Sequence, residues 1–160
     1  MIMSDLNYRS FSSIEENYYK NGSVIFLNLL NRFGLKATDK VLDIGCGSLR
    51  VGKHLIPFLK ESAYCGIEPE EKFLIEGIKW ELSQRMIDFK KPKFSSCADF
   101  CCESFNESFD LALASYVFVS CARNQLKTCL INLKNCLSKD GKFLFHVRFG
   151  EQSKHMSWEE

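Results

Sequence analysis

Short apolar runs alternate with amphipathic stretches along most of this chain. Mostly apolar runs occupy residues 40–44, 64–67 and 109–114, and others lie at 94–98 and 143–147. Strands that are covered on both faces of a parallel sheet have such predominantly apolar sequences. The pattern therefore predicts five mostly parallel strands.

Helical periodicity fills the intervals between these runs. Ser23 can cap a helix over 24–33 that Gly34 ends, and another helix is expected over 49–59. Two further helices follow from apolar side chains that recur every three or four residues. Their stripes are Ile75, Ile78, Leu82 and Met86 in one, and Leu126, Leu130, Leu133 and Leu137 in the other. This alternation predicts an α/β fold with a doubly wound sheet of about five strands.

Length and composition favour one domain. The chain has 160 residues, of which 46% are hydrophobic, enough for one core. We expect residues 23–150 to form this domain. Residues 1–22 then form an N-terminal segment that could act as a lid, and residues 151–160 form a polar tail.

Net charge and hydropathy argue against some classes of binding partner. The formal net charge is +1, from 21 basic and 20 acidic side chains, which gives no electrostatic case for nucleic acid. No apolar stretch is long enough to span a bilayer, and residues 1–10 lack a cationic-then-apolar leader. We therefore expect a cytoplasmic protein with reduced thiols, no membrane contact and a small-molecule partner.

The eight cysteines do not suggest a metal site. Cys97 and Cys101 have the C-x3-C spacing of one iron–sulfur motif, but Ser104 stands where its third cysteine belongs. No C-x2-C pair is present, so zinc is not expected either. Further along, Cys121, Cys129 and Cys136 fall near one face of a helix, which favours buried thiols.

The stretch VLDIGCGSLRVGKHL, residues 41–55, carries the main chemical signal. Glycines that follow a strand and open a helix let a ligand approach the backbone closely. A dinucleotide fingerprint needs a third glycine where Arg50 stands. A phosphate loop fits Gly47 to Lys53, but His54 replaces the hydroxyl residue that would bind magnesium.

S-adenosylmethionine has different requirements. An acid at the strand end, Asp43, can take its ammonium group, and the backbone at Gly45 and Gly47 can take its carboxylate. Glu68 follows the second strand, 21 residues after Gly47, which suits the ribose hydroxyls. Asp99 follows the third strand and can accept from the adenine amino group.

The side chains of Pro69 and Phe100 can flank the adenine ring. Each position also has a structural interpretation: the glycines can make a plain turn, Glu68 can cap a helix, and Asp99 can form a turn. Their occurrence at three successive strand ends favours a ligand site. An NAD-dependent oxidoreductase remains an alternative.

Five segments in order resemble class I S-adenosylmethionine-dependent methyltransferases. They are VLDIGCGSLRVG, YCGIEP, CADF, FDLALASYVF and LKNCLSKDGKFLFHV, within residues 21–147. The resemblance implies a Rossmann-like fold and S-adenosylmethionine as cofactor. Asp43, Gly45 and Gly47 would hold its methionine end, Glu68 its ribose, and Asp99 with Phe100 its adenine. We also assign Cys46, Pro69 and Ser115 to the cofactor site.

Two departures from the family pattern bear on activity. Many relatives read Ser-Val-Phe-Thr-His after the fourth strand, where this chain has residues 116–120 with Ser120 in the histidine position. No catalytic residue is therefore assigned. The family's final antiparallel hairpin is not evident after residue 147, so we expect a C-terminally truncated domain. An exposed sheet edge would then favour a dimer, and an inactive partner-binding module is the alternative function.

Overall fold

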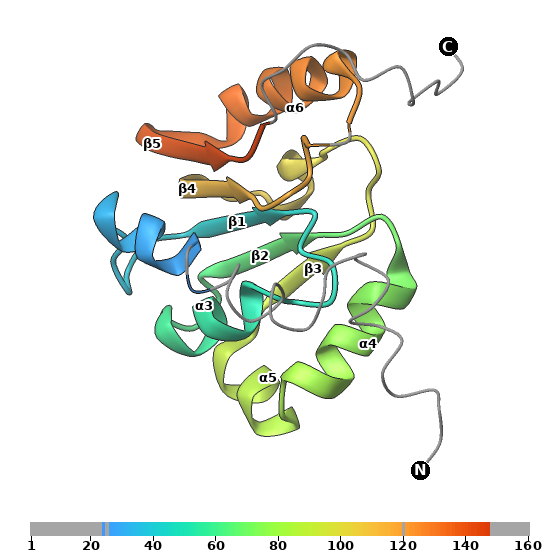
Figure 1. The fold of residues 1–160 in the computed structure, drawn as a ribbon. Coiled ribbons are helices and arrows are strands. Elements are labelled where there is room, and N and C mark those ends of the chain that lie inside the picture. Colours follow the sequence, from blue (N-terminus) through green and yellow to red (C-terminus); the bar gives the residue numbers. More distant parts are fainter. Residues whose placement is uncertain (1–23, 25, 120, 148–160) are drawn as a thin grey trace.

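One parallel sheet organises the protein (Figure 1). The computed structural model describes residues 24, 26–119 and 121–147. In this part of the chain the strands are ordered β3-β2-β1-β4-β5, and every neighbouring pair is parallel. Their bounds are β1 Val41–Ile44, β2 Tyr64–Ile67, β3 Lys93–Ser95, β4 Phe109–Ala114 and β5 Leu137–Phe145. The predicted Rossmann-like α/β fold with five strands is confirmed.

Helices cover both faces of the sheet (Figure 1). A helix over residues 26–32 precedes β1. The others are α3 Gly52–Phe58, α4 Glu71–Glu81, α5 Gln84–Lys90, the short 3-10 helix η1 Cys102–Phe105, and α6 Arg123–Cys136. The helix over 26–32 packs with α3 and α4 on one face, whereas α6 and η1 pack on the other. Because all the strands are parallel, the chain must cross one face of the sheet between each strand and the next.

The strand side chains divide into two cores. In β1, Val41 belongs to the core under α3, and Leu42 and Ile44 belong to the core under α6. In β4, Leu111 and Leu113 face the first core, while Ala112 and Ala114 face the second. Successive side chains point to opposite faces of a strand. Both faces of the central strands are therefore buried, as the mostly apolar runs predicted.

The strand order reverses between β1 and β4. The chain leaves β1 toward β2 and β3 on one side, and β4 and β5 lie on the other. In open α/β sheets, ligands bind beyond the carboxyl ends of the strands at such a switch point. The glycine loop after β1 therefore lies at the expected position for a ligand.

The helical stripes differ from the sequence prediction. Ile75 on α4 is 62% exposed and Leu130 on α6 is 47% exposed, whereas Leu74 and Leu133 are buried. Cys129 and Cys136 join Leu133 on the buried face of α6, as their spacing predicted, while Cys121 is only half-buried. On α6 two of the three buried positions are cysteines, so leucine spacing alone did not identify the buried face.

The predicted helix after β2 is two helices. It is interrupted at Leu82 and Ser83, between α4 and α5. Ser83 caps the second helix, because its hydroxyl oxygen accepts a hydrogen bond from the N–H of Met86 at 3.2 Å.

Several element boundaries also move. Strand β3, expected over 94–98, is Lys93–Ser95. The first helix after β1 begins at Gly52 rather than at Leu49, because Leu49 adopts a left-handed φ of 61°. Strand β5 spans Leu137–Phe145 rather than 143–147, because its pairing with β4 starts at Leu137 and continues from Lys142 after a shift of register.

Several sequence predictions concern parts outside this description. The possible lid at residues 1–22 and the polar tail at 151–160 lie outside the described residues. Among the described residues, no helix is both long and apolar enough to cross a membrane.

Candidate functional site

The loop after β1 requires its glycines. Gly45 and Gly47 have φ values of 65° and 54°, in the left-handed region that other residues rarely adopt. A Cβ atom on Gly45 would lie 2.5 Å from Cγ2 of Val117, in the segment after β4. The loop therefore touches the β4 end directly, across the switch point.

Three backbone N–H groups at the start of this loop are bonded within the protein. The N–H groups of Gly45 and Cys46 both donate to the carbonyl of Ile67, at 2.8 and 3.0 Å. The N–H of Gly47 donates to Oε2 of Glu68 at 2.9 Å. The loop is thus tied to the end of β2, and these donors face neighbouring protein atoms.

Glu68 joins the glycine loop to the segment that follows β2. Its Oε2 accepts from Gly47, and its Oε1 accepts from the N–H of Glu70 at 3.0 Å. Burial raises the pKa of Glu68, and the two backbone hydrogen bonds oppose that rise. Each carboxylate oxygen has two lone pairs, so one acceptor site on each oxygen remains for a ligand hydroxyl.

Asp43 lies beneath the loop. Its side chain is 2% exposed, and its Oδ2 accepts a hydrogen bond from the hydroxyl of Tyr64 at 2.7 Å. Burial raises the pKa of Asp43 to about 7, against smaller lowering effects of the Tyr64 hydrogen bond and the charge of Arg50. The carboxylate therefore bonds inward to β2, and Tyr64 is a partner that the sequence did not reveal.

Cys46 and Pro69 differ in exposure. The Cys46 thiol is buried, and that burial raises the pKa of the thiol well above its usual range. Cys46 therefore offers a ligand its backbone at most. Pro69 is exposed directly after Glu68, at the carboxyl end of β2.

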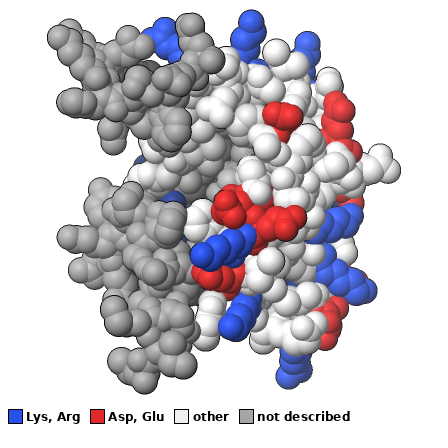
Figure 2. Space-filling view, turned by 90° about the vertical axis from the view of Figure 1, so that its right-hand side faces the viewer, with Lys and Arg blue, Asp and Glu red and all other residues white. Residues whose placement is uncertain are grey.

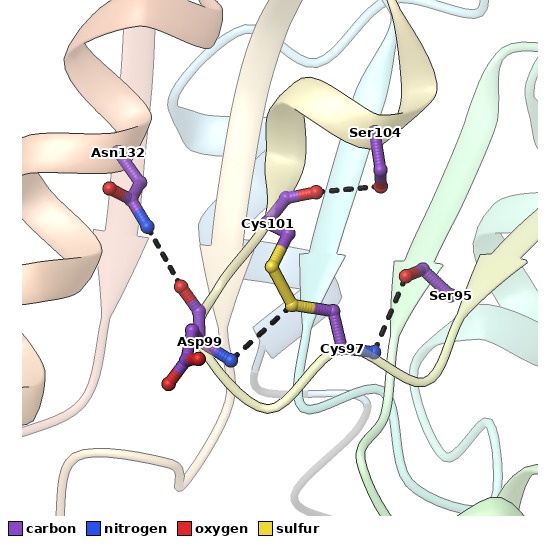
Figure 3. The surroundings of a disulfide bond; sticks show 6 residues. All are labelled: Ser95, Cys97, Asp99, Cys101, Ser104 and Asn132. Carbon is purple, nitrogen blue, oxygen red and sulfur yellow. Dashed lines mark hydrogen bonds between the residues drawn. A yellow bond between two sulfur atoms is a disulfide. The ribbon is translucent and has the colours of Figure 1, made fainter.

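A disulfide spans the predicted adenine loop (Figure 3). Cys97 and Cys101 are bonded, with Cα atoms 5.9 Å apart, and Asp99 and Phe100 lie between them. The expectation of reduced thiols is wrong for this pair, because the turn between them brings the two side chains together. The N–H of Asp99 also donates to Sγ of Cys97 at 3.4 Å.

Contacts with α6 and the β4 end position this loop. Asn132 donates its Nδ2 hydrogen to the carbonyl of Asp99 at 2.8 Å, so the loop lies against α6 (Figure 3). Phe100 has a left-handed φ of 56°, and its ring centroid is 5.9 Å from that of Phe118. The Asp99 side chain is exposed.

Ser115, directly after β4, contacts a residue that the sequence analysis had not placed in the site. Nη2 of Arg50 donates to the Ser115 hydroxyl at 2.8 Å, and the guanidinium carbon lies 4.8 Å from the ring centroid of Tyr116. Nδ1 of His146, after β5, accepts from the N–H of Tyr116 at 3.4 Å. Two sequence features could have pointed to these residues. Arg50 stands where a dinucleotide fingerprint has its third glycine, and His146 lies at the end of an apolar strand.

One described cavity lies at the other end of the sheet. It measures about 240 Å³ and is lined by residues at the amino ends of the strands, among them Asp39, Asp110 and Lys142. These polar groups bond to neighbouring protein atoms: Asp39 to Lys36, Asp110 to Lys40 and Ser138, and Lys142 to the carbonyl of Phe33. The predicted site residues are at the opposite, carboxyl end of the sheet.

Charged groups are mixed on the face toward which β1 and β2 point. Figure 2 shows this face, with acidic and basic side chains side by side rather than a continuous basic stripe on its described surface. A nucleic-acid interface requires clustered basic groups.

The comparisons define the class of protein. A family model described as a methyltransferase domain matches residues 42–143. The chain therefore belongs to the methyltransferase domain family. Among curated proteins, none matches significantly.

Solved structures share this fold at low sequence identity. An S-adenosylmethionine-dependent methyltransferase from Clostridium acetobutylicum aligns over 87% of this chain and 56% of its own, with 22% identity and a TM-score of 0.63. The glycopeptide N-methyltransferase MtfA in complex with S-adenosylmethionine aligns over 78% of this chain and 53% of its own, with 16% identity and a TM-score of 0.63. Streptomyces venezuelae DesVI aligns over 99% of this chain and 63% of its own, with 14% identity and a TM-score of 0.67. The chain thus spans a little over half of the length of these proteins.

Proposed function

We propose that this chain binds S-adenosylmethionine at the carboxyl ends of β1, β2 and β3 and transfers its methyl group to a small-molecule acceptor. The observation that carries the proposal is the contact between Gly47 and Glu68. It combines a left-handed glycine after β1 with a carboxylate at the end of β2, at the switch point of a methyltransferase-type sheet. Family membership supports the same reaction class.

The site residues are assigned by position. Glu68 would accept hydrogen bonds from both ribose hydroxyls through the acceptor sites that its backbone bonds leave. Asp99 would accept from the adenine amino group, with Phe100 and Pro69 beside the ring. The glycines allow close approach, and Asp43 reaches the ammonium group only through water, because its own carboxylate is buried.

The bound cofactor would supply a methyl carbon already activated by a positive sulfur. In the transfer the acceptor's lone pair would form the new bond to carbon, the carbon–sulfur pair would return to sulfur, and an acceptor proton would pass to water. The protein's contribution is alignment of the two reactants and exclusion of water. The segment after β4, with Tyr116, would help to position the acceptor.

The cofactor assignment is tested by calorimetry with S-adenosylhomocysteine. We expect micromolar binding to the wild type and a loss of about tenfold or more in Glu68→Ala, because two charge-assisted hydrogen bonds to ribose disappear. Glu61→Ala is the matched control, since Glu61 is an exposed carboxylate paired with Lys91. Absence of binding to the wild type would refute the proposal, and titration with NAD tests the oxidoreductase alternative.

The acceptor class has its own test. The mixed charge on the site face supports a small molecule rather than nucleic acid. Incubating the protein with a labelled methyl donor and fractionated metabolite extracts should place label in a small-molecule fraction. Label in macromolecules alone would contradict this assignment. Cytoplasmic location belongs to the same proposal and is checked by cell fractionation.

A partner-binding role is the second candidate. Strand β5 pairs only with β4 in the described sheet, so its outer edge has no described partner strand. Phe145 on this strand is 36% exposed. Unpaired edges favour association with another chain. A stable dimer in light scattering together with no S-adenosylhomocysteine binding would support this alternative over catalysis.

A further inference from the structure

Two cysteines enclose the residues proposed to hold adenine. Cys97 and Cys101 are bonded to each other and partly exposed, whereas the six other cysteines are free thiols. A disulfide stabilises a whole fold more when it closes a longer loop, because the closure entropy that it removes from the unfolded chain grows with loop length. This bond joins residues only four apart in the sequence. Its main effect is therefore local, on the loop that carries Asp99 and Phe100.

The backbone inside the bridge is strained at Phe100. Its φ of 56° lies in the left-handed region, which a residue with a Cβ atom enters only at a cost in free energy. The next residue, Cys101, has φ −73° and ψ 62°, and the N–H of Cys102 donates to the carbonyl of Phe100 at 2.8 Å, which makes an inverse γ-turn. Strained backbone of this kind persists only where the surrounding structure holds it.

The bridge is one of the constraints on this loop, and contacts with neighbouring elements are the others. Asn132 on α6 donates to the carbonyl of Asp99, and the Cys102 thiol donates to the carbonyl of Asn132 at 3.4 Å (Figure 3 shows the first contact). The Phe100 ring packs near Phe118, with centroids 5.9 Å apart. None of these contacts uses a bonded sulfur. Loss of the bond should therefore release the turn at Phe100 and leave the loop attached to α6.

We propose that the Cys97–Cys101 pair is a redox-sensitive switch that sets the affinity of the site for adenine. With the bond formed, Phe100 is held in its left-handed conformation and the exposed Asp99 is fixed at the end of β3. With the bond broken, Phe100 relaxes to an unstrained backbone and Asp99 is held less firmly. The inference rests on the proposed function, which assigns adenine to this loop. In the cytoplasm proposed for this protein, disulfides are mostly transient or redox-sensing.

The switch operates by thiol–disulfide exchange with a dithiol. A thiolate of the dithiol attacks one sulfur of the bridge, the sulfur–sulfur bond breaks, and a mixed disulfide forms. The second thiol of the reagent then displaces the protein sulfur. Cys97 and Cys101 gain two electrons and two protons and become thiols, while the dithiol loses the same number and becomes a disulfide. In the reverse direction, one oxidised glutathione is converted to two thiols as the bridge forms again.

Calorimetry on the oxidised and the reduced protein tests the switch with two nucleosides. 5′-Methylthioadenosine carries the adenine amino group, and 5′-methylthioinosine has an oxygen in its place. Reduction with dithiothreitol should weaken methylthioadenosine binding about threefold to tenfold and methylthioinosine binding less, because only the first has the amino group assigned to Asp99. A general loss of stability would not change the preference between the two nucleosides.

Cys97→Ser/Cys101→Ser is the variant that cannot form the bond. Its affinity for methylthioadenosine should match that of the reduced wild type and should not respond to dithiothreitol. Cys121→Ser, at a half-buried free thiol, should respond as the wild type does. Oxidised glutathione should restore the affinity of the reduced wild type, with mass spectrometry showing that Cys97 and Cys101 have paired again.

Hydrogen exchange, followed by NMR, gives a second readout that needs no ligand. The N–H groups of Asp99 and Cys102 are bonded inside this loop, to Sγ of Cys97 and to the carbonyl of Phe100. Both should exchange faster after reduction. The N–H of Met86, bonded to Ser83 at the start of α5, should not change and shows that the fold is retained.

Three results would overturn the switch. They are an unchanged affinity for methylthioadenosine after reduction, a lower affinity without faster exchange in the loop, and a response of the double variant to dithiothreitol. A wild type that binds methylthioadenosine equally well in both states refutes this inference alone and leaves the proposed function standing. A wild type that binds neither nucleoside nor S-adenosylhomocysteine in either state refutes the proposed function with it.

Discussion

The carboxylate of Glu68 holds the N–H of Gly47 at 2.9 Å, and so fixes the loop after β1 to the end of β2. Gly47 can occupy this place because its φ of 54° costs glycine little. A ligand that binds Glu68 therefore meets a loop whose conformation is already set.

Gly47→Ala should weaken both stability and cofactor binding. A Cβ atom there has only Oε2 of Glu68 within reach, at 4.0 Å, so the cost is backbone strain of about 1–2 kcal/mol rather than a clash. Gly34→Ala is the matched control, because Gly34 also has a positive φ of 83° and no atom near its Cβ position. Both variants should lose similar unfolding free energy in denaturant, but only Gly47→Ala should bind S-adenosylhomocysteine more weakly. Equal affinities would contradict the role of the loop.

Gly77→Ala should destabilise the protein although alanine favours helices. A Cβ atom at Gly77 on α4 would lie 2.6 Å from the carbonyl carbon of Ser48, in the glycine loop. Backbone atoms cannot yield as a flexible side chain does, so α4 must shift, at a cost of about 1–3 kcal/mol. Urea unfolding measures the loss, and Lys72→Ala on the exposed side of α4 serves as the control. If Gly77→Ala were more stable than the wild type, the close packing of α4 against the glycine loop at Ser48 would be contradicted.

Asp43→Asn should change how stability depends on pH. Burial raises the folded-state pKa of Asp43 to about 7, above the value of about 3.9 expected in the unfolded chain. The fold favours the protonated form of Asp43. Its contribution to the free energy of unfolding is therefore fully present below pH ~4 and is lost as pH rises through ~7. Asparagine does not ionise, so the variant should gain unfolding free energy relative to the wild type between pH 5 and 8, by up to a few kcal/mol.

The measurement is chemical unfolding at several pH values. Asp140→Asn, at an exposed carboxylate on β5, is the control and should leave the pH profile unchanged. Parallel pH profiles for Asp43→Asn and the wild type would contradict the prediction. Cofactor affinity is measured alongside, because Asp43 lies two residues before Gly45.

Loss of the Cys97–Cys101 bond should weaken nucleoside binding modestly. The bond closes the short loop that carries Asp99 and Phe100, and ordering such a loop on binding costs free energy when the cross-link is absent. We expect Cys97→Ser/Cys101→Ser to bind S-adenosylhomocysteine and methylthioadenosine about threefold to tenfold more weakly, since both contain adenine. Cys121→Ser, at a half-buried free thiol, is the control.

Mass spectrometry of the alkylated wild type checks that the bond forms. Alkylation of Cys97 and Cys101 in the protein purified without reductant would contradict it. If the double variant lost affinity for one nucleoside more than for the other, the removed bond would be acting on a part of the site other than the adenine loop.

The apolar runs predicted β2 and β4 at their observed bounds, because strands covered on both faces need predominantly apolar sequence. The helical faces were harder to predict. Ile75 and Leu130 fit an apolar period and yet point to solvent, since the choice between neighbouring apolar positions depends on which side packs against the sheet. Glu68 and Gly47 were both identified from spacing, but their hydrogen bond depends on how β1 and β2 pair.

The sequence alone determined the fold class, the glycine turn after β1 and the acids at the strand ends, because periodicity and backbone preference are local properties. Only the tertiary structure decided which groups meet. Arg50 lies 65 residues before Ser115 in the chain and reaches it because β4 pairs beside β1. Asp43 is buried against Tyr64 because β2 pairs on the other side of β1. These contacts depend on strand order and register, which no short stretch of sequence contains.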